Sequence, residues 1–296
     1  MTRAGDDKSE ICRKSGCPGG CLARLADVAA PDALAAALKR VVRAAGGAGG
    51  DGQTAGGFAR GGPAALARLS GSLVSGAYRP GSLRRFDIAK PDGRRRELAV
   101  PCVRDRIVQT ALAEALDRQF DAGMSSGSFA YRKGLSVEHA AALATLWRLR
   151  GWCYAVDADI EDFFGRVDHG LLLAMLRDRR VCRRSLRLVR LWLEGYSSAG
   201  KGLPQGSPVS PVLSNLYLDP FDRTVETERS KLVRYADDFL ILTRGRAEAE
   251  GALERARAAL AKLKLDLNAA KTRIADLREG IDFLGLRLEG DRIGRR

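Results

Sequence analysis

Residues 231–243 read Lys-Leu-Val-Arg-Tyr-Ala-Asp-Asp-Phe-Leu-Ile-Leu-Thr, and this stretch decides the fold. Two apolar, β-rich runs at 232–235 and 239–242 flank a short polar break. Such a pattern predicts a β-hairpin whose turn carries the adjacent acids Asp237 and Asp238. Two neighbouring carboxylates repel each other, and a hard divalent cation such as Mg²⁺ would offset that repulsion. Asp is also a common turn residue, so this stretch alone fits a water-exposed acidic turn equally well.

The length and composition of the chain limit the classes of protein to which it can belong. With 296 residues it could form one large domain or two closely packed subdomains. No apolar run is long enough to span a bilayer, and the charged N-terminus lacks a signal-peptide core. The six cysteines are scattered rather than arranged as a disulfide framework, which suits a reducing compartment. We therefore expect a cytoplasmic protein without a membrane partner.

The formal net charge of +14 favours a polyanionic partner, because Lys and Arg displace counterions from phosphates. A GC-rich genome would produce the same bias towards Ala and Arg, so the net charge alone does not establish a polyanionic partner. His139 and His169 are the only histidines, and the chain has no Gly-x-x-x-x-Gly-Lys-Ser/Thr phosphate loop. Because histidine-dependent catalysis has few candidate residues and a phosphate loop is absent, metal chemistry based on carboxylates is the class of mechanism that remains.

The N-terminal residues 1–30 are predicted to be a flexible segment. Within them, Cys12, Cys17 and Cys21 follow a C-x₄-C-x₃-C spacing that could bind zinc. This spacing differs from the usual C-x₂-C knuckle, and a fourth ligand is not evident nearby. Free thiols are the interpretation that we adopt.

Three further stretches have the composition of strands. Residues 83–100 predict two strands joined by a Pro-Asp-Gly turn, with a cluster of basic residues near its tip. Residues 152–160 predict a strand that delivers Asp157 and Asp159 on one face. A final β segment is predicted at 281–289.

Helices and loops fill the rest of the chain. Residues 46–62 are rich in Gly and predicted to be a loop, and Asp168 is predicted to cap a helix. A Pro/Gly-rich loop within 202–222 is predicted to open into another helix. Amphipathic spacing predicts helices at 31–45, 64–76, 103–120, 137–150, 183–194 (ended by Gly195) and 247–263.

A strand ending in Asp159, a later hairpin with two more acids and helices between them are the minimal components of a polymerase palm. Two metal ions held by carboxylates from two strands can activate a primer 3′-hydroxyl and stabilise the leaving pyrophosphate. The basic hairpin tip could then contact a triphosphate or a template backbone. A solvated charge run is its more ordinary interpretation.

From about residue 33 to 290 the chain resembles prokaryotic reverse transcriptases of the group II intron-like lineage, with the motifs in the family's order. The matching motifs are Gly49–Thr54, Lys90-Pro91-Asp92-Gly93, Val103–Gln109, Asp159-Ile160-Glu161-Asp162-Phe163-Phe164, Leu203-Pro204-Gln205-Gly206-Ser207-Pro208, Tyr235-Ala236-Asp237-Asp238, Leu267–Thr272 and Phe283-Leu284-Gly285. Gly165 departs from the pattern, because many relatives carry Asp there.

The resemblance implies an α+β fold of the right-hand polymerase type, with fingers and an antiparallel palm sheet packed by helices. It implies an N-terminal extension and fingers at 31–150, and a palm at 151–290 with fingers helices interleaved at 168–200. Residues 291–296 would be a tail. Because the similarity ends near residue 290, we expect the thumb to be absent or vestigial.

Carried over residue by residue, Asp159, Asp237 and Asp238 would hold two Mg²⁺ ions, with Mn²⁺ as a possible substitute. The Ile160 carbonyl would be an additional ligand. Lys271 would donate a proton to pyrophosphate, with a purely structural lysine as the alternative.

The resemblance also implies a nucleotide and primer–template site. Phe164 corresponds to a steric gate that crowds a ribose 2′-hydroxyl, and a core aromatic is its alternative. Gln205 and Gly206 would pack on the incoming nucleotide. The remaining contacts would come from Lys90 and Arg96 to the triphosphate, and from Tyr235, Arg94 and Arg95 to the primer or template.

The implied function is an RNA-directed DNA polymerase that extends a DNA or RNA primer with dNTPs on an RNA template. The biological setting would be CRISPR adaptation, phage defence or a retroelement. Further partners would be a noncoding RNA, CRISPR adaptation proteins or a protein that supplies a thumb. The stretches Asp157–Ile160 and Asp219–Asp222 are similar to reverse transcriptases found with CRISPR adaptation proteins. The alternatives are a degenerate palm that only binds nucleic acid and a template-independent nucleotidyltransferase.

Overall fold

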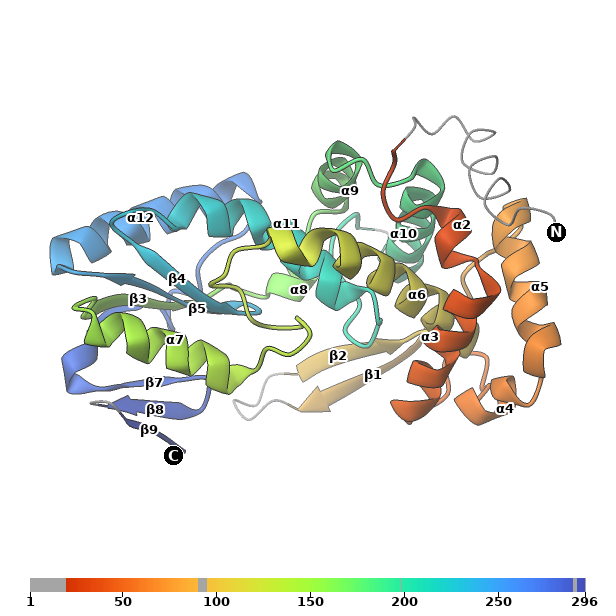
Figure 1. Ribbon diagram of the computed structural model, residues 1–296, viewed down its shortest axis with the longest axis horizontal. Coiled ribbons are helices and arrows are strands. Elements are labelled where there is room, and N and C mark those ends of the chain that lie inside the picture. The colour runs from red at the N-terminus through yellow and green to blue at the C-terminus, as the bar shows by residue number, and fades with distance from the viewer. Residues whose placement is uncertain (1–19, 90–94, 198, 290–291, 296) are drawn as a thin grey trace, which may run out of the picture. The chain divides into compact units, whose positions relative to one another are not determined.

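The computed structural model describes residues 20–89, 95–197, 199–289 and 292–295, which fold into two units (Figure 1). Unit 1 is formed by residues up to Ala122 together with Asp168–Leu213. Unit 2 is formed by Gly123–Val167 and the residues from Ser214 onwards. None of the described helices is both long and apolar enough to cross a bilayer.

A four-stranded antiparallel sheet with the strand order β4-β5-β3-β6 forms the centre of unit 2. The predicted hairpin is confirmed as β4–β5, in which Tyr235 pairs with Asp238. Ala236 has a positive φ of 59°, which closes the tight turn between the two strands. The strands of this sheet are β3 (Tyr154–Asp159), β4 (Lys231–Tyr235), β5 (Asp238–Thr243) and β6 (Arg273–Asp276).

Helices cover both faces of this sheet, with α7 (Val137–Leu149) on one side and α12 (Arg246–Lys262) on the other (Figure 1). The small residues of α7 let it pack closely on Val233, Leu240 and Leu242. These strand positions face α7 because side chains alternate between the two faces along a strand. The unit also contains α8 (Phe163–Arg166) and most of α11 (Ser210–Val225).

A second, three-stranded sheet packs beside α7 and consists of β7 (Ile281–Phe283), β8 (Leu286–Glu289) and β9 (Arg292–Arg295). The β segment predicted at 281–289 is confirmed, but it consists of two strands. It is a hairpin, because Leu284 and Gly285 both adopt positive φ values of 55° and 76° and reverse the chain. Ile281, Phe283 and Leu288 from this hairpin join the core under α7.

Unit 1 is mainly helical. In α3, the buried residues Leu34, Ala37 and Val41 recur on one face, and this helix packs against α6. Asp168 caps α9 as predicted, since its carboxylate accepts the Leu171 N–H at 2.8 Å. The helices are α2 (Leu25–Val28), α3 (Pro31–Arg43), α4 (Ala55–Ala59), α5 (Gly62–Ser75), α6 (Val103–Phe120), α9 (His169–Asp178) and α10 (Arg183–Tyr196).

The unit also contains an antiparallel hairpin of β1 (Arg84–Ala89) and β2 (Arg95–Val100). The two strands were predicted, whereas the Pro-Asp-Gly turn lies outside the described residues. Two other predictions need correction. Residues 46–62 are not entirely a loop, because Thr54 caps the short helix α4 by accepting the Gly57 N–H. Gly195 does not end α10, which continues to Tyr196 because Gly195 does not adopt the left-handed conformation that terminates a helix.

Candidate active site

Three acidic side chains predicted from the sequence meet at one end of the unit 2 sheet. Asp159 is the last residue of β3 and pairs with Asp238, the first residue of β5, across the antiparallel ladder. The Ile160 N–H donates to the Asp237 carbonyl at 3.2 Å. The residue after Asp159 is therefore bonded to the residue before Asp238. The polymerase hypothesis required Asp159 to lie beside the Asp237–Asp238 turn, and it does.

Negative charge accumulates at this point. Burial, together with the charges of Asp159 and Asp237, raises the pKa of Asp238 to about 7, although Lys271 opposes the shift. Asp159 is nearly buried, with 7% of its surface exposed. The arrangement is therefore one that an additional cation would stabilise.

The loop that follows α12 supplies two polar contacts to Asp159. Lys271 Nζ lies 3.0 Å from Asp159 Oδ2, and Asn268 Nδ2 donates to the same oxygen at 3.2 Å. The Asn268 N–H also donates to the Asp159 carbonyl at 2.8 Å. Partial burial would lower the pKa of Lys271, but its hydrogen bond to Asp159 and the three nearby carboxylates leave that pKa raised. Lys271 is therefore cationic at neutral pH.

Sequence analysis did not assign a role to Asn268. Its position three residues before Lys271, within one of the matching motifs, was the available signal. The other acid of β3, Asp157, is paired with Arg273 of the adjacent strand β6 at 2.8 Å. Asp157 therefore has a cationic partner of its own.

A buried arginine supports the hairpin turn, and this too was missed. Arg234 in β4 is completely buried and forms a two-pronged ion pair with the buried carboxylate of Asp222, with both N–O distances 2.6 Å. Its Nη1 atom donates to the carbonyl of Ala236 at 2.9 Å, directly before Asp237. Remaining donors reach Ser128 and Asn215. This network fixes the backbone that carries the acidic pair.

The donor set suits Mg²⁺, because carboxylate oxygens are the hard ligands that this ion prefers. Among the described residues, no three His, Cys, Asp or Glu side chains already form a group that could enclose a metal ion. Mg²⁺ commonly uses one or two carboxylates and completes its coordination with water and substrate phosphates. The three acids at the end of β3 and β5 fit that mode of binding.

Phe163 and Phe164 follow the acidic strand in the short helix α8. Phe163 is 1% exposed and is a core residue, whereas Phe164 is only half-buried. Their rings pack edge to face, with centroids 5.2 Å apart. Phe164 thus keeps part of its ring accessible while Phe163 supports it. Tyr235, at the end of β4, is half-buried as well.

The Gln205–Gly206 pair lies in unit 1, next to β2. The Gln205 carbonyl accepts the Ala99 N–H at 2.8 Å. Gly206 has a φ of 112°, and a Cβ atom there would lie 3.1 Å from the Ala99 carbonyl oxygen. Glycine is therefore required at this position, while the Gln205 side chain is partly exposed.

The basic hairpin residues are only partly described. Arg95 is exposed and forms an ion pair with Asp87 at 3.2 Å. Lys90 and Arg94 lie outside the described residues, as does the Arg96 side chain. Cys12 and Cys17 are also outside them, whereas Cys21 is buried next to Cys182.

Comparisons with known proteins agree with this architecture. The family model for reverse transcriptase (RNA-dependent DNA polymerase) matches residues 88–288. Protein YkfC of Escherichia coli (strain K12) is 31% identical over 267 residues, which cover 74% of this chain and 70% of YkfC. The group II intron-encoded protein LtrA of Lactococcus lactis subsp. cremoris is 29% identical over 178 residues, which cover 57% of this chain and 29% of LtrA.

A telomerase structure from Candida albicans, in complex with a TWJ fragment of telomeric RNA, has the same fold at 14% identity. Its TM-score is 0.57, and the match covers 74% of this chain and 45% of the telomerase chain. The predicted α+β fold of fingers and palm is thus confirmed, as is the group II intron-like lineage. Because the family model covers more than half of its length, this chain belongs to the reverse transcriptase family of RNA-directed DNA polymerases, which are nucleotidyltransferases.

Proposed function

We propose that this chain extends a DNA or RNA primer with dNTPs on an RNA template by two-metal-ion catalysis. The observation that supports this most strongly is the meeting of Asp159, Asp237 and Asp238 at one end of β3 and β5. Residues 151–290 would be the palm, with fingers helices at 168–200, and residues 31–150 would be the N-terminal extension and fingers. Residues 123–150, however, cluster with unit 2.

In this proposal Asp159, Asp237 and Asp238 hold the Mg²⁺ ions that reverse transcriptases generally use, with the Ile160 carbonyl as a further ligand. Mn²⁺ could substitute. The bound ions would lower the pKa of the primer 3′-hydroxyl and stabilise the charge on the leaving pyrophosphate. Asn268 would hold the Asp159 carboxylate in position through its bond to Oδ2.

Lys271 would serve as the proton donor to pyrophosphate. Its ammonium group contacts Asp159 directly, and its raised pKa keeps the proton available at neutral pH. Gln205 and Gly206 would pack on the incoming nucleotide, and Lys90 and Arg96 would contact its triphosphate. Tyr235, Arg94 and Arg95 would contact the primer or template.

Phe164 would be the steric gate against ribonucleotides. Replacing Phe164 by Ala is expected to improve the use of rNTPs relative to dNTPs by about 10- to 100-fold, because the 2′-hydroxyl would gain space. The ratio of kcat/KM values for the two nucleotide types measures the effect. Phe164→Tyr retains the ring and should keep the original preference. An unchanged ratio in Phe164→Ala would assign this side chain to packing alone.

The overall proposal is tested by primer extension with the full chain, an RNA template, Mg²⁺ and dNTPs. Template-dependent DNA products that disappear with a chelator would support it. Products that form without a template would favour a template-independent nucleotidyltransferase. Nucleic-acid binding without any synthesis, under either Mg²⁺ or Mn²⁺, would favour a palm that only binds.

The biological setting belongs to the proposal too. CRISPR adaptation, phage defence and retroelement mobility are all compatible with this chemistry. CRISPR adaptation proteins, a noncoding RNA or a thumb-supplying protein would be partners in one or another of these settings. Co-purification of the chain with its bound nucleic acids and proteins from its host would distinguish these three settings.

A further inference from the structure

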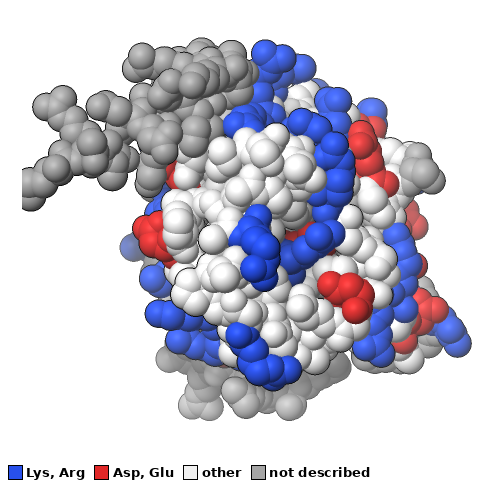
Figure 2. Space-filling view, turned by 90° about the vertical axis from the view of Figure 1, so that its right-hand side faces the viewer, with Lys and Arg blue, Asp and Glu red and all other residues white. Residues whose placement is uncertain are grey.

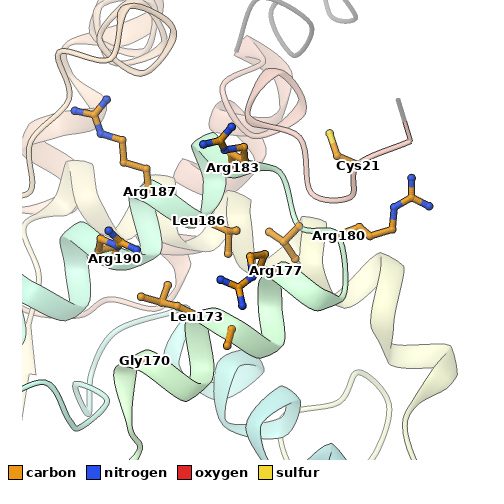
Figure 3. Close-up of a pocket in the computed structure, with 11 residues that line it drawn as sticks. Cys21, Gly170, Leu173, Arg177, Arg180, Arg183, Leu186, Arg187 and Arg190 are labelled. Carbon is orange, nitrogen blue, oxygen red and sulfur yellow. The ribbon is translucent and has the colours of Figure 1, made fainter. Parts of the chain in front are cut away.

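A cavity of about 660 Å³ lies between α9 and α10 in unit 1, and five arginines line it (Figure 3). All five side chains are exposed. Leu173 and Leu186 also line the cavity, and both are half-buried. The arginines are Arg177, Arg180, Arg183, Arg187 and Arg190.

The arrangement of these arginines follows from the helices. Arg183, Arg187 and Arg190 are spaced i, i+4 and i+7, so they follow one face of α10 about one 5.4 Å turn apart. Arg177 comes from the last turn of α9, which packs against α10. The packed helix pair therefore carries a row of arginines on α10 and a further one, Arg177, on α9.

Acids among the described residues do not balance the charge of this row. Within the part of the chain that the structure describes, no carboxylate lies within ion-pair distance of Arg183, Arg187 or Arg190. Arg177 forms an ion pair with its neighbour Asp178 at 3.7 Å, and because both side chains are more than 70% exposed this pair contributes little. Elsewhere in the protein, arginines such as Arg273 have acidic partners. Figure 2 shows Lys and Arg gathered in strips on the face of the molecule that it draws.

The chemistry of the lining identifies the class of ligand. Apart from the guanidinium groups, the described lining residues are Cys, Gly, Ala, Val and Leu, so the lining offers no strong side-chain acceptor for the N–H groups of a peptide or a base. A phosphodiester backbone presents acceptors, and arginine binds phosphate oxygens in a two-pronged manner. None of the described residues that line the cavity is aromatic, whereas single-stranded nucleic acids are generally bound through base stacking on aromatic rings.

We propose that this α9–α10 cavity binds the sugar–phosphate backbone of an RNA duplex, such as a stem of a structured RNA. Duplex RNA is recognised mainly through its shape and backbone, which suits a site with donors and no base-reading groups. The choice of RNA rests on the proposed function, whereas the site itself rests on the geometry of the two helices.

The test is binding of a fluorescent RNA hairpin to the full chain at several salt concentrations, without primer, dNTPs or divalent ions. The variant combines Arg183→Gln, Arg187→Gln and Arg190→Gln. Loss of three phosphate contacts should reduce the slope of log affinity against log salt by about 2 to 3 and weaken binding roughly 100-fold near 0.1 M salt. The matched control removes three exposed arginines of unit 2 as Arg229→Gln, Arg246→Gln and Arg257→Gln, and should weaken binding less than about threefold.

Arg190→Gln alone should reduce the slope by about 1, which keeps the test decisive if the triple variant is unstable. Equal loss in the pocket and control variants would overturn the proposal. So would equally tight binding of a DNA duplex through the same arginines, or binding of polyglutamate in place of the hairpin. Primer extension at saturating primed template should be unchanged in the pocket variant. If the chain makes no DNA but the pocket variant loses hairpin binding, the proposed polymerase function is overturned and the proposed RNA site in the α9–α10 cavity is still supported.

Discussion

Replacing Asp237 and Asp238 together by Asn is expected to reduce the rate of primer extension at least about 1,000-fold, on the order of 4 kcal/mol of transition-state stabilisation. The substitution keeps the size of both side chains but removes two of the three charges that would hold the ions. Since burial and the charges of Asp159 and Asp237 raise the pKa of Asp238 to about 7, the fold should tolerate the loss of the Asp237 and Asp238 charges. Single-turnover extension of a labelled primer with saturating dNTPs measures the effect.

Asp157→Asn is the matched control, because it lies on the same face of β3 but is paired with Arg273. Its extension rate should stay within about threefold of the unmodified chain. The doubly substituted chain should still bind the primed template with near-normal affinity. Substantial synthesis by the Asp237→Asn, Asp238→Asn chain would show that the β4–β5 turn is not the catalytic centre.

Arg234→Met is expected to lower the free energy of unfolding by about 3–5 kcal/mol, since it leaves the buried carboxylate of Asp222 without its partner. Urea denaturation monitored by circular dichroism measures this change. The exposed pair Arg273–Asp157 offers a comparison, because Arg273→Met should cost less than about 1 kcal/mol.

The double variant Arg234→Met, Asp222→Leu separates stability from positioning. Removing both charges should restore most of the lost stability, as apolar replacements of buried ion pairs often do. The hydrogen bond from Arg234 to the Ala236 carbonyl remains absent, so the turn that carries Asp237 is less well held. We expect slower primer extension at nearly normal stability. A fully active double variant would limit Arg234 to a role in folding.

The sequence predicted the elements with a strong pattern. The β4–β5 hairpin and β3 follow a run of alternating or continuous apolar residues around identifiable acids, and α6 begins and ends at the residues that its amphipathic spacing indicated. The sequence pattern was insufficient where the φ angles of single residues decided where a strand or a helix ends. The reversal at Leu284–Gly285 depends on two positive φ angles, and the termination of α10 depends on a glycine that stays helical.

Within the site, the position of the three acids could be predicted, but the polar groups that support them could not. Arg234 lies in a stretch whose composition is that of an apolar strand. Its ion pair with Asp222 becomes apparent only when helix α11 is packed against the sheet. Asn268 likewise contacts Asp159 across 109 residues of sequence. Long-range polar contacts of this kind have no periodicity, so a single sequence does not reveal them.

The pairing of Asp159 with Asp238 makes the length of the 236–237 turn as critical as the acids that it carries. Neighbouring residues on a strand project to opposite sides, so deleting one turn residue would bring Phe239 to the place of Asp238 and move Asp238 into the turn. Natural variants of this chain should consequently keep the length of this turn as strictly as they keep Asp237 and Asp238.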